Sequence, residues 1–90
     1  MPSLKRTRDG AGDIGPMSTI MRENPATKEL EYEYDQRPRT GWAMRVGSIT
    51  ARSFANQDWW QTTIITEILE NTETMVRFKT GNSEYIWKEI

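Results

Sequence analysis

The C-terminal third of the chain constrains the fold most, because residues 62–90 carry the pattern of three short strands joined by tight turns. The segment opens with the run TIIT at residues 63–66, followed by Ile68. Residues branched at Cβ are stiff about the first side-chain torsion and pack better on a pleated sheet than on a helix. The apolar residues among 64–69 are also spaced as on one face of a helix with a threonine N-cap, but the composition favours a strand.

Two further strands follow in the same segment. After the turn-forming residues Asn71 and Thr72, residues 75–79 alternate apolar and charged side chains, which indicates a strand with one face in water. Gly81 and Asn82 come next, and both can take the positive φ that a two-residue hairpin turn of the primed type requires. The next strand contains Tyr85, Ile86 and Trp87.

Two more strands are predicted upstream. Leu30, Tyr32 and Tyr34 alternate with acidic residues, which is typical of a half-buried strand whose other face is acidic and solvated. A second alternation begins at Trp42 and continues towards Phe54. Short strands joined by tight polar connectors predict a small antiparallel β-barrel, since closure removes exposed sheet edges.

Residues 1–28 differ in composition from the rest of the chain, because they contain no aromatic residue and several Gly and Pro residues. A segment so poor in large apolar groups cannot offset the entropy of ordering itself. We therefore predict an extended or flexible N-terminal arm over residues 1–28 and a barrel domain over residues 29–90 that folds without it.

Apolar residues in this arm have helical spacing, at Ile14, Met17 and Met21. Pro16 suits a first helical turn and Asn24-Pro25 a stop, so a short helix is predicted near residues 16–23. Such a helix is stable only if its apolar face is buried.

Six residues are the predicted contacts with a partner: Ile14, Met17, Ile20, Met21, Trp59 and Trp60. The apolar residues of the arm are expected to dock on a protein partner or on another subunit, because a free tail has no use for them. Neighbouring residues of a strand point to opposite faces, so one of Trp59 and Trp60 needs cover from a base, a peptide or the rest of the chain.

Composition restricts the chemistry that this chain can perform. It contains neither Cys nor His, which removes thiolate metal ligands, the usual general base and the commonest transition-metal ligand. The acidic residues do not have the spacing of a calcium-binding loop. We therefore expect a protein that is not an enzyme, with no catalytic residue, no cofactor and no bound metal.

Charge and hydropathy restrict the partners. With 12 basic and 13 acidic residues, the net charge of −1 gives no field that would gather nucleic acid or an anionic membrane. No apolar run approaches the roughly 20 residues that span a bilayer, and the N-terminus lacks the apolar block of a secretory signal. The expected location is inside a host cell or in a virion, without membrane contact and with weak nucleic-acid binding.

The C-terminal third resembles a pattern of small phage and viral β proteins, in which T-[ST]-x-[IV]-x-E-[IV] precedes [RK]-[ST]-x-N-S-x-Y. The first part is TTIITEI at residues 62–68 and the second is KTGNSEY at residues 79–85. The resemblance implies a viral accessory or virion protein and does not specify an activity.

A second resemblance is to signalling Src-homology-3 domains. Their ALYDY-like start is similar to LEYEYD at residues 30–35, and their paired tryptophans are similar to Trp59 and Trp60. The resemblance implies a Src-homology-3-like barrel, and an oligonucleotide-binding-type barrel is the alternative fold. The expected function is a protein–protein interaction or assembly component of a virus or phage, and the alternative is a small barrel that binds single-stranded nucleic acid.

Overall fold

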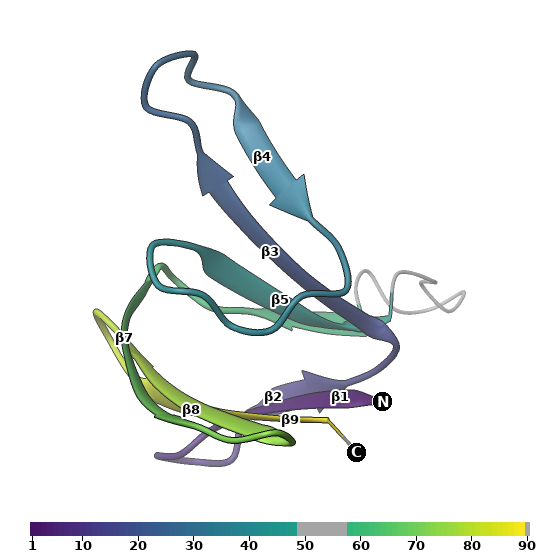
Figure 1. Ribbon diagram of the computed structural model, residues 1–90. Coiled ribbons are helices and arrows are strands. Elements are labelled where there is room, and N and C mark those ends of the chain that lie inside the picture. The colour runs from purple at the N-terminus through teal and green to yellow at the C-terminus, as the bar shows by residue number, and fades with distance from the viewer. Residues whose placement is uncertain (49–57, 90) are drawn as a thin grey trace.

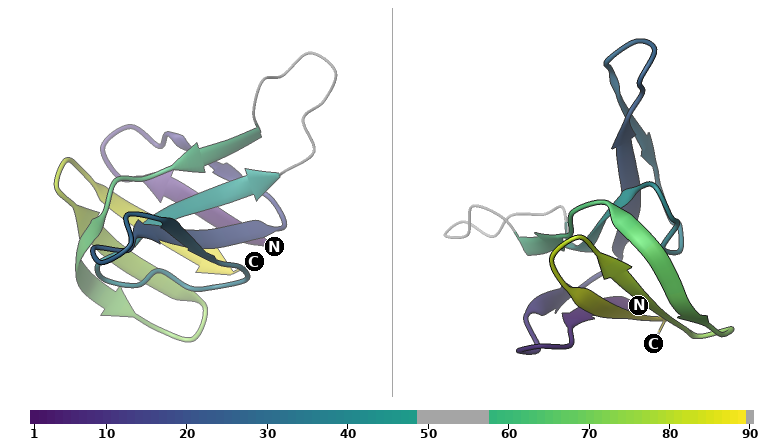
Figure 2. Two further views of the ribbon diagram at one scale, coloured as in Figure 1. Left: turned by 90° about the horizontal axis from the view of Figure 1, so that it is seen from above. Right: turned by 90° about the vertical axis from the view of Figure 1, so that its left-hand side faces the viewer.

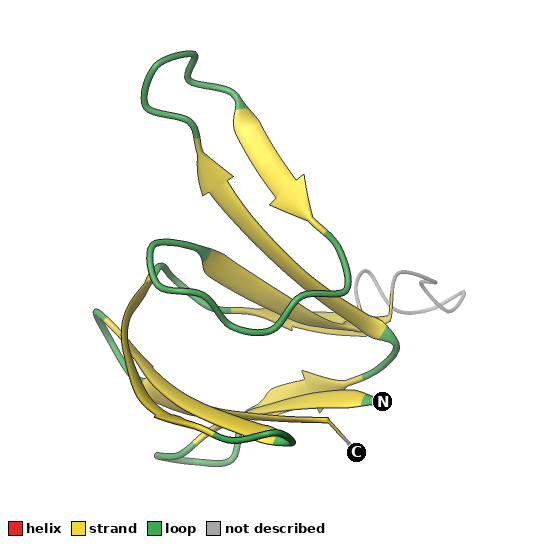
Figure 3. Ribbon diagram, in the orientation of Figure 1, coloured by secondary structure: helices red, strands yellow, loops and turns green. Residues whose placement is uncertain are grey.

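The computed structural model describes residues 1–48 and 58–89, where the regular secondary structure is entirely β (Figure 3). The strands are β1 (Pro2–Arg6), β2 (Gly12–Ile14), β3 (Met17–Glu23), β4 (Leu30–Glu33), β5 (Ala43–Ser48), β6 (Asp58–Gln61), β7 (Ile65–Asn71), β8 (Met75–Thr80) and β9 (Glu84–Glu89). They form two antiparallel sheets, sheet A in the order β2-β1-β9-β8-β7 and sheet B in the order β4-β3-β5-β6. The predicted mainly β class is confirmed.

The two sheets face each other and enclose the core (Figure 1). Alternate residues of the strands point inward, as with Val76 and Phe78 on β8. The ring of Phe78 stacks on that of Tyr85 at a centroid distance of 5.5 Å. The buried core consists of Leu4, Ile20, Trp42, Met44, Val46, Ile65, Val76, Phe78, Tyr85 and Trp87.

The predicted closed barrel is not formed by residues 1–48 and 58–89, because the hydrogen-bonded ladders stop at four edge strands. Between β6 and β7 the chain crosses from one sheet to the other in a short loop. The buried Thr62 secures this crossing, since its Oγ1 accepts a hydrogen bond from the Met44 amide at 3.1 Å. The Ile65 amide then donates to the Trp42 carbonyl oxygen at 2.9 Å. The link between the sheets is therefore a loop and not a continuous bent strand.

The structure does not contain the predicted N-terminal arm as a separate segment, because residues 2–23 form strands of both sheets. β1 lies between β2 and β9, and its pairing with β9 runs from Pro2↔Glu89 to Arg6↔Tyr85. Leu4 is fully buried in the core. These hydrogen bonds and the burial of Leu4 offset the ordering entropy, although the segment itself has few large apolar groups.

The predicted short helix near residues 16–23 is wrong, because these residues form β3 at the centre of sheet B. Ile20 and Met21 are both buried, but on opposite faces of the strand. Ile20 points into the core, whereas Met21 lies on the outer face between Tyr32 and Ala43 of the neighbouring strands. Two buried strand faces therefore produced the spacing that resembles one face of a helix.

The three strands predicted in the C-terminal third are confirmed as β7, β8 and β9. The first begins at Ile65, two positions later than the β-branched run, and Ile64 is left exposed. β7 has register shifts between Ile65 and Glu67 and between Ile68 and Glu70. Because a bulge inserts an extra residue, both Ile65 and Ile68 can face the core despite their spacing of three.

The hairpin between β8 and β9 does not use the predicted primed turn, because neither Gly81 nor Asn82 has positive φ. The Thr80 Oγ1 instead accepts hydrogen bonds from the amides of Asn82, at 3.3 Å, and Ser83, at 3.2 Å. These hydrogen bonds to the Thr80 hydroxyl stabilise the turn, so the turn does not need residues in the left-handed backbone conformation. The predicted continuation of the β5 strand to Phe54 lies outside the described residues.

Gly15 is required where the chain passes from sheet A to sheet B. A Cβ atom at Gly15 would lie 2.2 Å from the carbonyl oxygen of Gly47, which is backbone and cannot move aside. We expect Gly15→Ala to lower the free energy of unfolding by about 1–3 kcal/mol, as overpacking does. Chemical denaturation measures the change. Gly81→Ala is the matched control, because a Cβ atom there meets nothing within 4 Å, and an equal loss in both variants would contradict the steric explanation.

Candidate interaction surfaces

Each of the four tryptophans lies under at least one arginine guanidinium. The distances from the guanidinium carbon to the ring centroid are 5.1 Å for Arg6 and Trp60, 4.6 Å for Arg22 and Trp42, 5.2 Å for Arg37 and Trp87, 5.2 Å for Arg39 and Trp42, and 4.8 Å for Arg45 and Trp59. A guanidinium over an indole ring is attracted by the ring quadrupole. These ring faces are therefore already occupied by the protein's own side chains.

The two arginines that lie against the Trp42 ring also hold β4 through its carboxylates. Arg22 forms an ion pair with Glu31 at 3.5 Å, and Arg39 forms one with Glu33 at 2.9 Å. Trp42 is only 5% exposed, so both arginines are held against a buried ring. The acidic face of β4 is consequently turned towards the protein, where its carboxylates are paired.

The half-buried side of β4 is therefore the acidic one and not the apolar one, although the side chains of Glu31 and Glu33 are still 34% and 40% exposed. Glu33 stands opposite the core residue Ile20 in the register with β3, so the two share a face. Leu30 is 61% exposed, Tyr32 42% and Tyr34 68%. Leu30 and Tyr32 lie on the outer face of β4, and Tyr34 follows directly after the strand. We call Leu30, Tyr32 and Tyr34 the hairpin stripe.

The hairpin stripe belongs to the part of the molecule that extends farthest from sheet A. The tip of the β3–β4 hairpin projects away from sheet A, as the right-hand view of Figure 2 shows. β4 is an edge strand of sheet B, so one side of its backbone has no strand partner within the described residues. An edge strand with exposed apolar side chains is a template for binding another chain.

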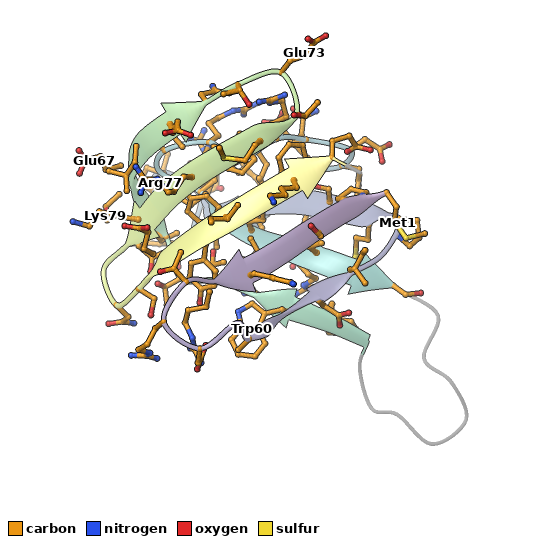
Figure 4. The ribbon with its side chains drawn as sticks, turned by 90° about the horizontal axis from the view of Figure 1, so that it is seen from below. Met1, Trp60, Glu67, Glu73, Arg77 and Lys79 are labelled. Atoms are coloured by element: carbon orange, nitrogen blue, oxygen red, sulfur yellow. The ribbon has the colours of Figure 1, made fainter. Side chains whose placement is uncertain are left out.

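A groove lies on the opposite side of the molecule, on the outer face of sheet A. It has a volume of about 530 Å³ and crosses β2, β1 and β9, on the face that Figure 4 presents. Its lining residues are Ser3, Leu4, Lys5, Gly10, Gly12, Asp13, Ile14, Ile86 and Lys88. We call it the lysine groove.

The register of the strands places lysine and isoleucine alternately on this face. Lys5 of β1 stands opposite Ile86 of β9, and Ser3 stands between Ile14 of β2 and Lys88 of β9. The lysine groove therefore combines apolar walls with ammonium groups. Within residues 1–48 and 58–89, neither lysine forms an ion pair.

The turn between β1 and β2 at one end of the groove is fixed by a carboxylate. The Arg6 guanidinium donates to both carboxylate oxygens of Asp9, at 3.0 and 2.7 Å, and the Ala11 amide donates to Oδ1 at 3.0 Å. These hydrogen bonds hold the pKa of Asp9 well below its ordinary value. The carboxylate thus stays charged at neutral pH, and Arg6 links the turn to Trp60 of β6. Figure 4 shows Trp60 beside this turn.

The structure separates the six residues that the sequence predicted as partner contacts. Ile20 and Met21 are buried, and Met17 is half-buried. These side chains therefore leave little surface on which a partner could dock. Ile14 is 52% exposed and lines the lysine groove. The two remaining residues, Trp59 and Trp60, are half-buried and lie on opposite faces of β6.

Trp60 packs against the core, and its Nε1 donates to the Tyr85 hydroxyl at 3.3 Å. Trp59 lies on the outer face opposite Gly47, beneath Arg45. One of Trp59 and Trp60 was predicted to need cover from another group, and Arg45 covers the ring of Trp59.

Sequence reasoning missed both the outward direction of the hairpin stripe and the lysine groove. The first could have been suspected from the basic residues near β4, since Arg22 and Arg39 offer partners to an acidic face. The second arises only when β1 and β9, from opposite ends of the chain, pair with each other.

The structure supplies no group that suggests other chemistry in its described part. Residues 1–48 and 58–89 hold no cluster of three or more acidic side chains that could bind a metal ion. The same residues include no helix long and apolar enough to span a bilayer.

Comparisons of the chain with models of protein families, with curated proteins and with solved structures give no match. The two surfaces described above therefore carry the functional argument by themselves.

Proposed function

We propose that this protein is a non-enzymatic protein–protein interaction or assembly component, and that it binds its partner through the hairpin stripe. The observation that carries the proposal is an edge strand, β4, with Leu30 and Tyr32 exposed on one face. The resemblance of the C-terminal third to small phage and viral β proteins supports a virion or its assembly as the setting.

Two physical terms favour binding at this edge. Removing a Leu-sized side chain from water gains about 1.5–3 kcal/mol, so a partner that covers the hairpin stripe gains binding free energy. A partner strand added beside β4 would also pair the backbone groups on the free side of the strand. Glu31 and Glu33 are already held by arginines, which keeps this backbone in strand geometry before binding and lowers the entropy cost.

The alternative function, binding of single-stranded nucleic acid, receives less support from the same contacts. A base-stacking platform needs an aromatic face that is free and surrounded by unpaired cations. Each tryptophan instead carries an arginine on its ring. Arg22 and Arg39 in addition form ion pairs with glutamates, and such pairing leaves them weak contacts for phosphate.

Site-specific photo-crosslinking tests the proposed function. We expect p-benzoylphenylalanine in place of Tyr32 to form a covalent adduct with a protein when the chain is illuminated in its native cell. The benzophenone keeps an aromatic ring at an exposed position of the hairpin stripe. Adducts are detected by gel mobility and identified by mass spectrometry, and a purified partner is then used to measure the dissociation constant.

The matched control places the same photoreactive residue at Ile64. This position is also exposed, at 45%, but lies in the loop between β6 and β7. The adduct at position 32 should disappear when Leu30→Ser is added. Equal labelling at positions 32 and 64, or no adduct at position 32, would reject the hairpin as the binding element.

A further inference from the structure

The hairpin and the lysine groove are complementary in charge. The β3–β4 hairpin carries the carboxylates Glu23, Glu29, Glu31, Glu33 and Asp35 against the cations Arg22 and Lys28. Glu31 and Glu33 are paired with arginines, whereas Glu23, Glu29 and Asp35 form no ion pair within the part of the chain that the structure describes. The hairpin therefore offers free carboxylates beside exposed apolar side chains.

The lysine groove has the opposite sign of charge, because two lysines outnumber its one acidic residue, Asp13. Lys5 and Lys88 are exposed and belong to neighbouring cross-strand rows, and Ile14 and Ile86 provide apolar surface between them. The volume of about 530 Å³ lies within the range of about 300–1,000 Å³ that accommodates bound side chains or small ligands. An acidic, apolar hairpin matches both the charge and the hydrophobicity of this groove.

We propose that the lysine groove binds the β3–β4 hairpin of a second copy of this chain, so that copies join head to tail. This inference rests on the proposed function, because it names the partner of the same hairpin. The contacts are Leu30 and Tyr32 of one copy against Ile14 and Ile86 of the next. The carboxylates of Glu23 and Glu29 pair with the two groove lysines at the rim.

The placement of the two surfaces excludes docking within one copy. The hairpin tip and the β1–β2 turn lie at opposite ends of the molecule in Figure 1 and in the right-hand view of Figure 2. The molecule measures 38 Å along its longest axis, and the hairpin is held in its outward position by the arginines on Trp42. A copy's own hairpin therefore cannot fill its groove, and a hairpin that binds there must come from another copy.

A symmetric contact between two hairpins is less favourable than this head-to-tail contact. Pairing β4 with β4 of another copy would bring the acidic hairpins of both copies together and would leave the two groove lysines without carboxylate partners. A contact between two different surfaces instead leaves one hairpin and one groove free at the ends of each pair. Such heterologous contacts produce rings if the rotation closes and filaments if it does not.

Complementation between two purified variants tests the inference by sedimentation velocity. The hairpin variant carries Leu30→Ser and Tyr32→Ser, and the groove variant carries Lys5→Glu and Lys88→Glu. All four positions are exposed, so both variants should keep the wild-type thermal transition. We expect the wild type to associate further as its concentration rises, and each variant alone to associate at least about tenfold more weakly.

The mixture of the two variants gives the decisive result. The groove variant keeps an intact hairpin and the hairpin variant an intact groove, so an equimolar mixture should form a dimer and nothing larger. Dimerisation of the mixture should weaken as salt is raised, because exposed ion pairs are screened. An additional groove variant with Glu23→Lys and Glu29→Lys should regain association with itself, since the charges are then exchanged.

Two results would overturn the inference and leave the proposed function standing. Association of the groove variant as strong as that of the wild type would show that the hairpin binds elsewhere, including on another hairpin. A wild type that stays monomeric while the Tyr32 crosslinker captures a different protein would show that the partner is not this chain. Loss of the crosslinked adduct together with intact self-association through another surface would reject both.

Discussion

Deletion of residues 1–23 is expected to abolish the cooperative thermal unfolding of the remaining fragment. The deletion removes β1, β2 and β3, so β9 loses one of its two neighbours in sheet A, and β4 and β5 lose the strand between them. It also removes Leu4 and Ile20, two fully buried members of the core. Domains of this size are marginally stable, and the loss of two core residues and three strands exceeds what such a domain can tolerate.

Circular dichroism and differential scanning calorimetry of residues 24–90 measure this effect. The prediction from composition, that the barrel domain folds without its arm, requires the opposite result. A sharp transition in the fragment near the temperature of the intact chain would mean that the first three strands are dispensable. Full-length protein carrying Leu4→Ala serves as an intermediate case, with an expected loss of about 2–5 kcal/mol.

Substitution of Trp42 by alanine is expected to cost about 3–5 kcal/mol of unfolding free energy, which approaches the whole stability of a marginal domain. Trp42 is 5% exposed, packs in the core and contacts the guanidinium groups of both Arg22 and Arg39. Its removal leaves a cavity and takes away the surface on which both arginines rest. The β3–β4 hairpin should then exchange its amide hydrogens faster than sheet A does.

Trp59→Ala is the matched control, because Trp59 also lies under an arginine, Arg45, at 4.8 Å. It is half-buried on the outer face of sheet B and is not part of the core. We expect a loss of about 1–2 kcal/mol there, from one cation–π contact and partial burial. Urea denaturation of both variants provides the comparison, and a smaller loss for Trp42→Ala than for Trp59→Ala would contradict the role given to Trp42.

If copies join head to tail, assembly requires both the N-terminal strands and the C-terminal strand. The lysine groove is assembled from β1, β2 and β9, whereas its proposed ligand comes from β3 and β4. A variant that fails to close β1 onto β9 should therefore lose the groove before it loses the hairpin. Assembly would then depend on folding of the N-terminal strands, because no groove exists until Lys5 and Lys88 share one sheet face.

The alternation of apolar and charged residues predicted strands correctly where one strand face is apolar and the other is exposed to water. β8 has Val76 and Phe78 in the core and Lys79 exposed, as its period of two predicts. The same reasoning failed for β3, because both of its faces are buried and the apolar positions no longer follow one period. It also misplaced the first residue of β7, where bulges change the spacing of inward-facing side chains.

The sequence by itself determined the mainly β class, the three C-terminal strands and the absence of Cys and His, because these depend only on residue types and near neighbours. The tertiary structure alone decided that the N-terminal strands belong to the core and that β4 turns its apolar side outward. The physical reason for the second is the burial of Trp42 in the core, because Arg22 and Arg39 lie against its ring beside β4. Arg22 and Arg39 lie close to β4 in the sequence, but only the completed fold sets their guanidinium groups against Trp42, where they pair with Glu31 and Glu33.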